Sequence, residues 1–179
     1  MKTALRPYQQ EAVSAFLSRG KGTVKAHPGA GKTLIACAII EQLREFEQFD
    51  AVTRLPAGVG EGPFLTLVIT LTLELKTQWR KVLDEQEVGD EVLIITYAKA
   101  GRMLDNARFW AAFSLIILDE AHHTAEGAQW SRILVPVFKA KYALGLTSTP
   151  PTDPKNPLLR VLPIVYTRTF EEGLEEGYA

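Results

Sequence analysis

Residues 26–33 read AHPGAGKT, and this stretch decides the fold class. Gly29 and Gly31 allow consecutive backbone N–H groups to point at one anion, and Lys32 can reach the outer phosphates of a nucleotide. The hydroxyl of Thr33 can join the shell of a magnesium ion in such a loop. The stretch therefore predicts a phosphate-binding loop, with a solvated glycine turn that caps a helix as the alternative.

The neighbours of this stretch are those that phosphate binding needs. Residues 23–26 fit a short buried strand, and residues 32–46 (KTLIACAIIEQLREF) have the apolar spacing of a long, mostly buried helix. The N-terminus of that helix adds a favourable dipole for an anion. Ala26 replaces the glycine that usually begins the loop, but it falls at the strand end, ahead of the tight curvature at Gly29 and Gly31. The departure weakens the formal pattern and leaves the mechanism intact.

Four later stretches are apolar enough to be central strands of a parallel sheet. They are residues 64–70, 91–96, 114–120 and 142–147, and each is expected to be buried on both faces. Helical and strand-like stretches alternate from end to end of the chain. This alternation indicates an α/β fold built on a parallel sheet.

The part of the chain before residue 64 is expected to hold a first helix, a break and a loop as well. The first helix is predicted to open at Pro7 and to bury one apolar face. Gly20 and Gly22 are expected to break the chain after that helix. Residues 47–63 are rich in glycine and proline, which predicts a mobile surface loop.

Composition bounds the number of domains and the kinds of partner. The chain has 179 residues, 46% of them hydrophobic, which suits one compact domain with a sizeable core. Twenty Lys and Arg against 21 Asp and Glu give a formal net charge of −1, so any nucleic-acid binding must come from a local face. Cys37 is the single cysteine and no apolar run suits a membrane span, so we expect a cytoplasmic protein without a membrane partner.

A second motif, LIILDEAHH at residues 115–123, places two acids after a buried strand. Asp119 and Glu120 are expected at the carboxyl end of that strand, at the same sheet edge as the phosphate loop. Asp119 there suits magnesium, and Glu120 suits polarisation of a water that attacks the γ-phosphate. A lone Asp-Glu pair would be read as solvated, but the phosphate loop supplies its partner. His122 and His123 are not expected to form a zinc site, because sequence neighbours seldom point at one ion.

The order of motifs resembles the first RecA-like domain of a superfamily-two helicase or translocase. The stretches that carry the resemblance are RPYQQEA, AHPGAGKT, TLTLELKTQW, IITYA, LDEAHH and GLTSTP. RPYQQEA, the Gln-Trp pair and FEEGLEEGYA look most like the branch of excision-repair helicases, phage repair helicases and restriction-enzyme motor subunits. The resemblance implies one three-layer P-loop NTPase domain over residues 1–179, with a central, mostly parallel sheet and with ATP and Mg²⁺ as cofactors.

The resemblance also implies a role for each matching residue. Adenine recognition would fall to Arg6 and Gln9. Phosphate and magnesium binding would fall to His27, Pro28, Gly29, Ala30, Gly31, Lys32 and Thr33, with Asp119 on the metal. Hydrolysis would depend on Lys32, Asp119 and Glu120. Coupling between nucleotide state and nucleic acid would involve His122, Thr147, Ser148 and Thr149. Nucleic acid, DNA rather than RNA, would be contacted near Thr72 and Thr96.

Three features near the expected nucleic-acid track have more than one interpretation. Leu71 stands where the family often has proline, which leaves the local turn geometry open. Trp79 could stack on a base, but a Trp late on a helix is more often a packed core residue. Lys76, Arg80 and Lys81 are expected to form one basic helix face, either simply solvated or binding phosphates.

The resemblance implies a partner as well. Family members use two RecA-like lobes, and the second supplies an arginine finger and half of the nucleic-acid track. The chain ends soon after GLTSTP, so we expect the second lobe to be supplied in cis or in trans. A small P-loop kinase and a regulatory nucleotide-binding module without turnover are the alternatives. The kinase reading leaves Glu120 and the TSTP stretch unexplained.

Overall fold

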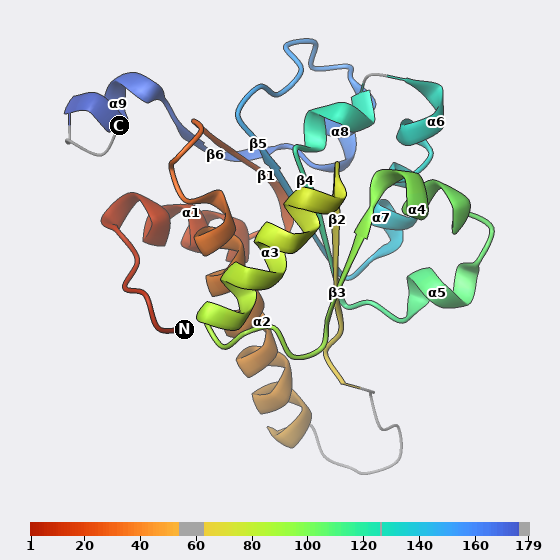
Figure 1. The fold of residues 1–179 in the computed structure, drawn as a ribbon, viewed down its shortest axis with the longest axis horizontal. Helices are drawn as coiled ribbons and strands as arrows, with labels where there is room; N and C mark the ends of the chain where they lie inside the picture. Colours follow the sequence, from red (N-terminus) through yellow and green to blue (C-terminus); the bar gives the residue numbers. More distant parts are fainter. Residues whose placement is uncertain (54–62, 126, 176–179) are drawn as a thin grey trace.

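A computed structural model describes residues 1–53, 63–125 and 127–175 (Figure 1). Six strands form one sheet in the order β3-β2-β4-β5-β1-β6, and every neighbouring pair is parallel. The predicted α/β fold with a parallel sheet is confirmed. The strands are β1 (Lys21–Ala26), β2 (Thr66–Thr70), β3 (Val92–Thr96), β4 (Leu115–Asp119), β5 (Tyr142–Thr147) and β6 (Ile164–Arg168).

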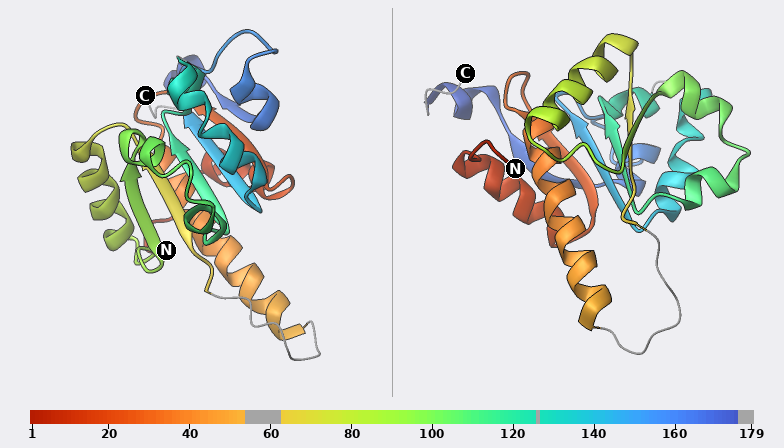
Figure 2. Two further views of the ribbon diagram at one scale, coloured as in Figure 1. Left: turned by 90° about the vertical axis from the view of Figure 1, so that its right-hand side faces the viewer. Right: turned by 60° about the horizontal axis from the view of Figure 1, so that its bottom comes forward.

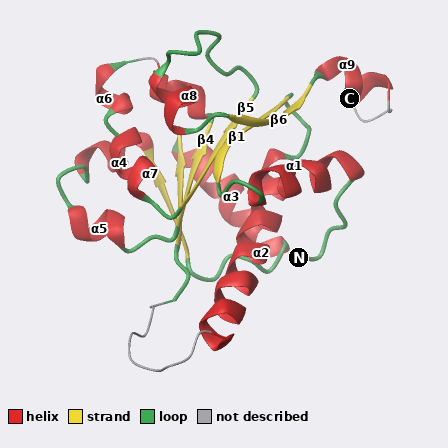
Figure 3. Ribbon diagram, turned by 180° about the vertical axis from the view of Figure 1, so that it is seen from behind, coloured by secondary structure: helices red, strands yellow, loops and turns green. Residues whose placement is uncertain are grey.

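Helices cover both faces of the sheet and make the outer two of three layers (Figure 3). The first face carries α1 (Pro7–Leu17), α2 (Lys32–Thr53) and α3 (Leu73–Glu85). The other carries α4 (Tyr97–Arg102), α5 (Ala107–Ala111), the 3₁₀ helix η1 (Ala121–Ala125), α6 (Ala128–Ser131), α7 (Leu134–Lys139) and α8 (Pro157–Val161). A last helix, α9 (Phe170–Glu175), follows β6. Within the described ranges, no helix is both long and apolar enough to cross a membrane.

The central strands owe their continuous apolar sequences to burial on both faces. Along β4, Leu115 and Ile117 join the core under α1, α2 and α3, while Ile116 and Leu118 join the core on the opposite face. Successive side chains of a strand point to opposite faces, so a strand between two helical layers must be apolar at every position. A strand at the edge of the sheet is less fully covered and does not need to be apolar at every position. β3 is an edge strand and leaves Leu93 42% exposed, so the expectation that it is buried on both faces is wrong.

The second half of α2 corrects the predicted loop. The helix continues to Thr53, so residues 47–53 are helical, and residues 54–62 of the predicted loop lie outside the described part. Glu47 anchors this half, because its carboxylate accepts hydrogen bonds from Lys141 Nζ at 2.7 Å and Tyr142 Oη at 2.6 Å. These contacts join α2 to β5, nearly a hundred residues along the chain. Figure 2 shows the end of α2 running past the sheet.

Gly20 and Gly22 have different roles. Gly20 has φ +72°, so it ends α1 in a conformation that favours glycine, as predicted. Gly22, expected to break the chain, lies inside β1 instead. Its lack of a side chain serves packing, since a Cβ there would stand 2.3 Å from Val165 Cγ1 and 3.0 Å from the carbonyl oxygen of Pro163. Gly22 therefore lets β6 approach β1.

Substitution of Gly22 should weaken the fold while a second glycine should not. Gly22→Ala should lower the free energy of unfolding by about 1–3 kcal/mol, because the new methyl group overpacks the β1–β6 contact. Gly101→Ala is the control, since no atom lies within 4 Å of a Cβ at this α4 position. It should raise stability by about 0.5–1 kcal/mol, the helical preference for alanine. Urea denaturation measures both, and equal midpoints for the two variants would contradict the packing role.

Candidate nucleotide site

The carboxyl edge of the sheet brings together the segments that follow β1, β4 and β5. β5 lies between β4 and β1, with Asp119 paired to Leu146 and Lys25 paired to Thr147. The ends of all three strands therefore stand at one level of the sheet. The predicted common edge for the glycine loop and the acidic pair is confirmed, and the Thr-Ser-Thr segment after β5 leaves the sheet between them.

The glycine loop has the backbone that its sequence predicts. Gly29 has φ +83° and Gly31 has φ +73°, both in the region that only glycine adopts readily. Lys32 Nζ donates to the carbonyl oxygen of Ala26 at 3.1 Å, so the lysine lies back over the loop from the start of α2. Ala26, which stands where the usual first glycine would be, is buried at the end of β1 and contributes this carbonyl.

Two side chains from α1 hold the tip of the loop. Tyr8 Oη and Gln9 Nε2 each donate to the carbonyl oxygen of Ala30 at 3.0 Å. The Gln9 side-chain oxygen also accepts from the backbone N–H of Arg6 at 2.9 Å, which caps α1. A Cβ at Gly31 would lie 2.5 Å from Gln9 Nε2. Gln9 thus lies against the loop as expected, and its contact with adenine stays a prediction.

Further aromatic and basic groups surround the same loop. The guanidinium of Arg168, at the end of β6, stands 4.6 Å from the centroid of the Tyr8 ring, and the His27 ring meets Phe170 of α9 edge-on at 5.7 Å. Sequence reasoning did not single out Tyr8 or Arg168. The only available signal for Tyr8 was its place beside Gln9, and nothing local marks Arg168.

Asp119 is buried at the end of β4 and has partners from three other elements. Its Oδ2 accepts from Trp79 Nε1 at 2.8 Å and from Thr70 Oγ1 at 3.4 Å. Its backbone carbonyl accepts from Tyr97 Oη at 2.9 Å. Burial raises the pKa of the Tyr97 hydroxyl well above its usual value, and the charges of Asp119 and Glu120 raise it further. Tyr97 is therefore a neutral donor throughout the physiological pH range.

Trp79 packs in the core, as predicted. It also forms a hydrogen bond that the sequence did not indicate. Its side chain is 3% exposed, which leaves no face for a stacked base. Its indole N–H donates a hydrogen bond to Asp119, forty residues away in the chain. A Gln-Trp pair on a helix indicates packing, but no local pattern indicates a bond to a carboxylate on another strand.

Glu120 has an unusual backbone and leads into the coupling residues. Its φ is +49°, in the left-handed region that non-glycine residues seldom adopt, and Glu87 and Glu91 before β3 share this backbone. His122 Nδ1 lies 3.5 Å from Glu120 Oε2 and 2.8 Å from Thr147 Oγ1. Thr147 Oγ1 also accepts from the backbone N–H of Thr149 at 3.1 Å. Ser148 lies between these threonines on the same segment. The structure thus joins the acidic motif to the segment after β5.

Thr72 and Thr96 cap the helices that follow β2 and β3. Thr72 Oγ1 accepts from the backbone N–H of Leu75, and Thr96 Oγ1 accepts from that of Lys99, each at 3.3 Å. Both threonines stand at the carboxyl edge of the sheet, next in order after β4. Their contact with nucleic acid stays a prediction.

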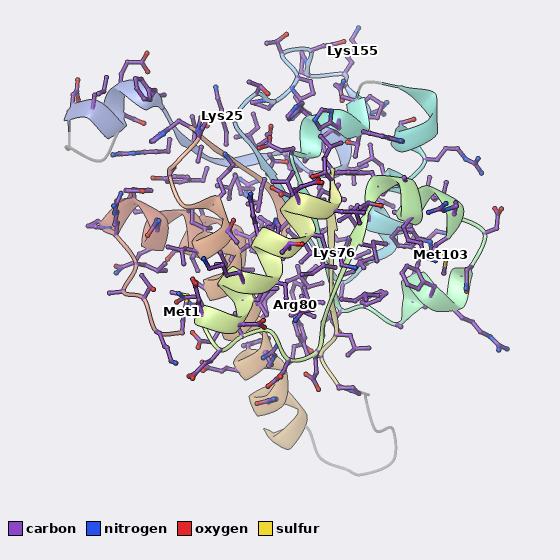
Figure 4. The ribbon with its side chains drawn as sticks, in the orientation of Figure 1. Met1, Lys25, Lys76, Arg80, Met103 and Lys155 are labelled. Atoms are coloured by element: carbon purple, nitrogen blue, oxygen red, sulfur yellow. The ribbon has the colours of Figure 1, made fainter. Side chains whose placement is uncertain are left out.

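The basic face expected on α3 is only partly formed (Figure 4). Arg80 donates to the carbonyl oxygens of Gly89 at 3.2 Å and Val92 at 2.9 Å, which ties α3 to the start of β3. Lys81 pairs with Glu85 along the helix at 3.9 Å. Lys76 is exposed on the outer surface of α3. Two backbone carbonyls hold Arg80 while its side chain stays 43% exposed, so a phosphate-binding role for the three cations stays a prediction.

The donor set fits magnesium with a nucleotide. Mg²⁺ is commonly bound by one or two carboxylates together with phosphate oxygens and water. Thr33 at the start of α2 and Asp119 at the end of β4 offer one hydroxyl and one carboxylate at the same edge. Within the described ranges no cluster of three or more His, Cys, Asp or Glu side chains could hold a metal alone. A metal here would therefore depend on phosphate ligands.

A parallel sheet with a phosphate loop after β1 and an acidic pair after β4 defines a RecA-like P-loop NTPase domain. The family model described as the res subunit of type III restriction enzymes matches residues 2–152. The chain belongs to this family.

Similar proteins include a DNA translocase and DNA helicases. The DNA 3'-5' translocase XPB2 of Sulfurisphaera tokodaii is 31% identical over 96% of this chain, and the putative DNA 3'-5' helicase Rad25 of Halobacterium salinarum is 34% identical over 82%. The chain spans 37% and 23% of these two relatives. The structure of the UvsW helicase from bacteriophage T4 matches with a TM-score of 0.67 at 16% identity, over 90% of this chain and 58% of that one. The resemblance to the repair branch of superfamily two is confirmed.

Replacement of the loop lysine should weaken nucleotide binding strongly and spare the fold. Lys32→Ala deletes a cation whose hydrogen bond within the described residues is to the backbone carbonyl of Ala26. Hydrogen bonds to charged groups contribute about 1.5–3 kcal/mol, so an ATP analogue should bind roughly 10- to 100-fold more weakly. Fluorescence titration measures binding, and circular dichroism checks the fold. Unchanged affinity would contradict the phosphate-loop assignment.

Proposed function

We propose that the chain is the ATP-binding lobe of a DNA-dependent ATPase, a helicase or translocase that works with a second RecA-like lobe. One observation carries this proposal. The 2.8 Å contact between His122 Nδ1 and Thr147 Oγ1 joins the acidic motif after β4 to the Thr-Ser-Thr segment after β5. A motor needs such a link between nucleotide and track, and simple phosphoryl transfer does not. The names of the relatives, a DNA translocase and DNA helicases, support DNA as the track.

The residues at the carboxyl edge divide the work of ATP hydrolysis. The backbone N–H groups of residues 29–33 and the Lys32 ammonium would hold the phosphates, with Thr33 and Asp119 on Mg²⁺. The ion, when bound, neutralises charge on the β- and γ-phosphates. Glu120 would orient and polarise the attacking water. Its carboxylate lies 3.5 Å from His122, and His122 in turn contacts Thr147, so Glu120 would be linked to the segment after β5 through this histidine.

DNA would lie along the same edge, beyond β4. The N-termini of α3 and α4, with Thr72 and Thr96 as their caps, present N–H groups and hydroxyls suited to backbone phosphates. Such contacts position a strand without reading its sequence. The second lobe would supply an arginine to the transition state and the other half of the track.

Two alternatives have weaker support. A small P-loop kinase leaves the link between His122 and Thr147 without a purpose. A regulatory module that binds nucleotide without turnover would share the fold, so an assay of hydrolysis separates it from the motor. A cytoplasmic location is part of the proposal. It is supported by the proposed use of ATP and DNA, which are both found inside the cell.

Neutralising Glu120 should separate binding from turnover. Glu120→Gln keeps the shape of the side chain and removes the charge that polarises water. In the chain assembled with a second lobe, the rate constant for hydrolysis should fall about 10²- to 10⁴-fold, while Mg-ATP still binds. Glu45→Gln, an exposed position on α2, is the control and should leave the rate unchanged. Full activity of the Glu120 variant would remove this residue from the mechanism.

The chain alone should be a poor ATPase. An arginine supplied from outside contributes roughly 10³ to 10⁵ in rate in well-studied phosphoryl-transfer enzymes, and a half-open site stays wet. Residues 1–179 should therefore bind Mg-ATP weakly, hydrolyse it slowly and respond little to DNA. Addition of a second lobe, fused or separate, should restore turnover and DNA stimulation together. A steady-state assay with and without duplex DNA at low and physiological salt tests this, and strong DNA-stimulated turnover by the monomer would contradict it.

A further inference from the structure

A buried indole is bonded to the carboxylate that is assigned to magnesium. Trp79 Nε1 donates to Asp119 Oδ2 at 2.8 Å, with Trp79 3% exposed and Asp119 9% exposed. Thr70 Oγ1 lies 3.4 Å from the same oxygen. Both donors reach Oδ2, and within the described residues no hydrogen bond to Oδ1 is formed. The two carboxylate oxygens are thus in different environments.

The geometry fixes how the carboxylate is turned. A carboxylate at the end of a strand can rotate about its Cβ–Cγ bond, and rotation exchanges the two oxygens. A short bond from a rigid ring to one oxygen opposes this rotation, because a hydrogen bond to a charged group is worth more than one between neutral groups. Oδ2 is held toward α3, and Oδ1 is left for a ligand.

The chemistry of the indole suits this task. An indole N–H donates and cannot accept, so it can neither bind a metal nor take a proton from the site. A histidine or asparagine at the same place would offer a lone pair and could compete for the ion. The ring itself packs in the core between α3 and the sheet, together with Leu83, so its N–H is held in one direction.

We propose that Trp79 is a positioning residue that orients Asp119 for Mg²⁺. The inference rests on the proposed function, because it assumes that Asp119 holds the ion of Mg-ATP. Partners in the second layer around a metal usually set the ligand's orientation, and their replacement typically costs about 10- to 100-fold in metal affinity.

The chain supplies a matched control. Trp110 is 7% exposed and also donates its indole N–H at 2.8 Å, but to the backbone carbonyl of Met103 on the other face of the sheet. Trp79→Phe and Trp110→Phe therefore each remove an indole N–H donor from a buried ring. Only the first removes it from Asp119.

The first test measures how ATP-analogue binding depends on Mg²⁺ concentration. Trp79→Phe should need about 10- to 100-fold more Mg²⁺ for half-maximal enhancement of binding, with binding in EDTA unchanged. Trp110→Phe should match the parent in both. Circular dichroism confirms that each variant is folded. An unchanged Mg²⁺ requirement in a folded Trp79→Phe would overturn the proposal.

A second measurement needs no substitution at Trp79. The chain has three tryptophans, so ¹⁹F NMR of protein labelled with 5-fluorotryptophan gives three resonances, assigned by elimination with Trp110→Phe and Trp130→Phe. The Trp79 resonance should shift when Mg²⁺ is added to nucleotide-bound protein, and the Trp110 resonance should not. A Trp79 resonance whose chemical shift does not change on addition of Mg²⁺ would overturn the proposal even if Trp79→Phe fails to fold.

The two proposals fail in different ways. A parent protein that binds no nucleotide, with or without Mg²⁺, removes the proposed function and this inference with it. A parent that binds nucleotide in a Mg²⁺-dependent manner, beside a Trp79→Phe variant with the same dependence, removes this inference alone.

Discussion

The burial of a single carboxylate, Asp119, constrains the rest of the site. A buried charge is costly unless hydrogen bonds compensate for the lost water. Asp119 obtains these bonds from β2 through Thr70 and from α3 through Trp79, and its backbone is bonded from α4 through Tyr97. Two elements that lead toward the proposed DNA track, β2 and α3, are thereby bonded to the carboxylate of Asp119, and a third, α4, is bonded to its backbone. A shift of the carboxylate would change the bonds to Thr70 and Trp79.

The sheet makes that arrangement possible. Because all six strands are parallel, their carboxyl ends share one edge, and each loop or helix that follows a strand begins there. The order of the strands then sets the order of the proposed functions along the edge. The phosphate loop follows β1, the coupling segment β5, the acidic motif β4 and the two capped helices β2 and β3. Nucleotide chemistry and the proposed track thus occupy neighbouring stretches of one continuous edge.

Local signals explain what the sequence predicted well. The positive φ of Gly29 and Gly31 and the buried central strands depend on residues close by in the chain. These features can be predicted because the residue types that local geometry requires stand close together in the sequence.

Long-range contacts explain the features that could not be predicted from the sequence. The extension of α2 depends on Glu47 meeting Lys141, and the space at Gly22 depends on Val165 of β6. Arg80 is held by carbonyls near β3, and the bond from Trp79 to Asp119 crosses between two elements. Such pairs leave no periodic pattern in one sequence.

The most direct test is a crystal structure of the chain with Mg²⁺ and a non-hydrolysable ATP analogue. The account predicts phosphates on the backbone of residues 29–33, Lys32 moved from the Ala26 carbonyl to the phosphates, and the metal beside Thr33 and Asp119. Trp79 should still be bonded to Oδ2. A nucleotide bound elsewhere on the chain, or a metal that avoids Asp119, would contradict the account.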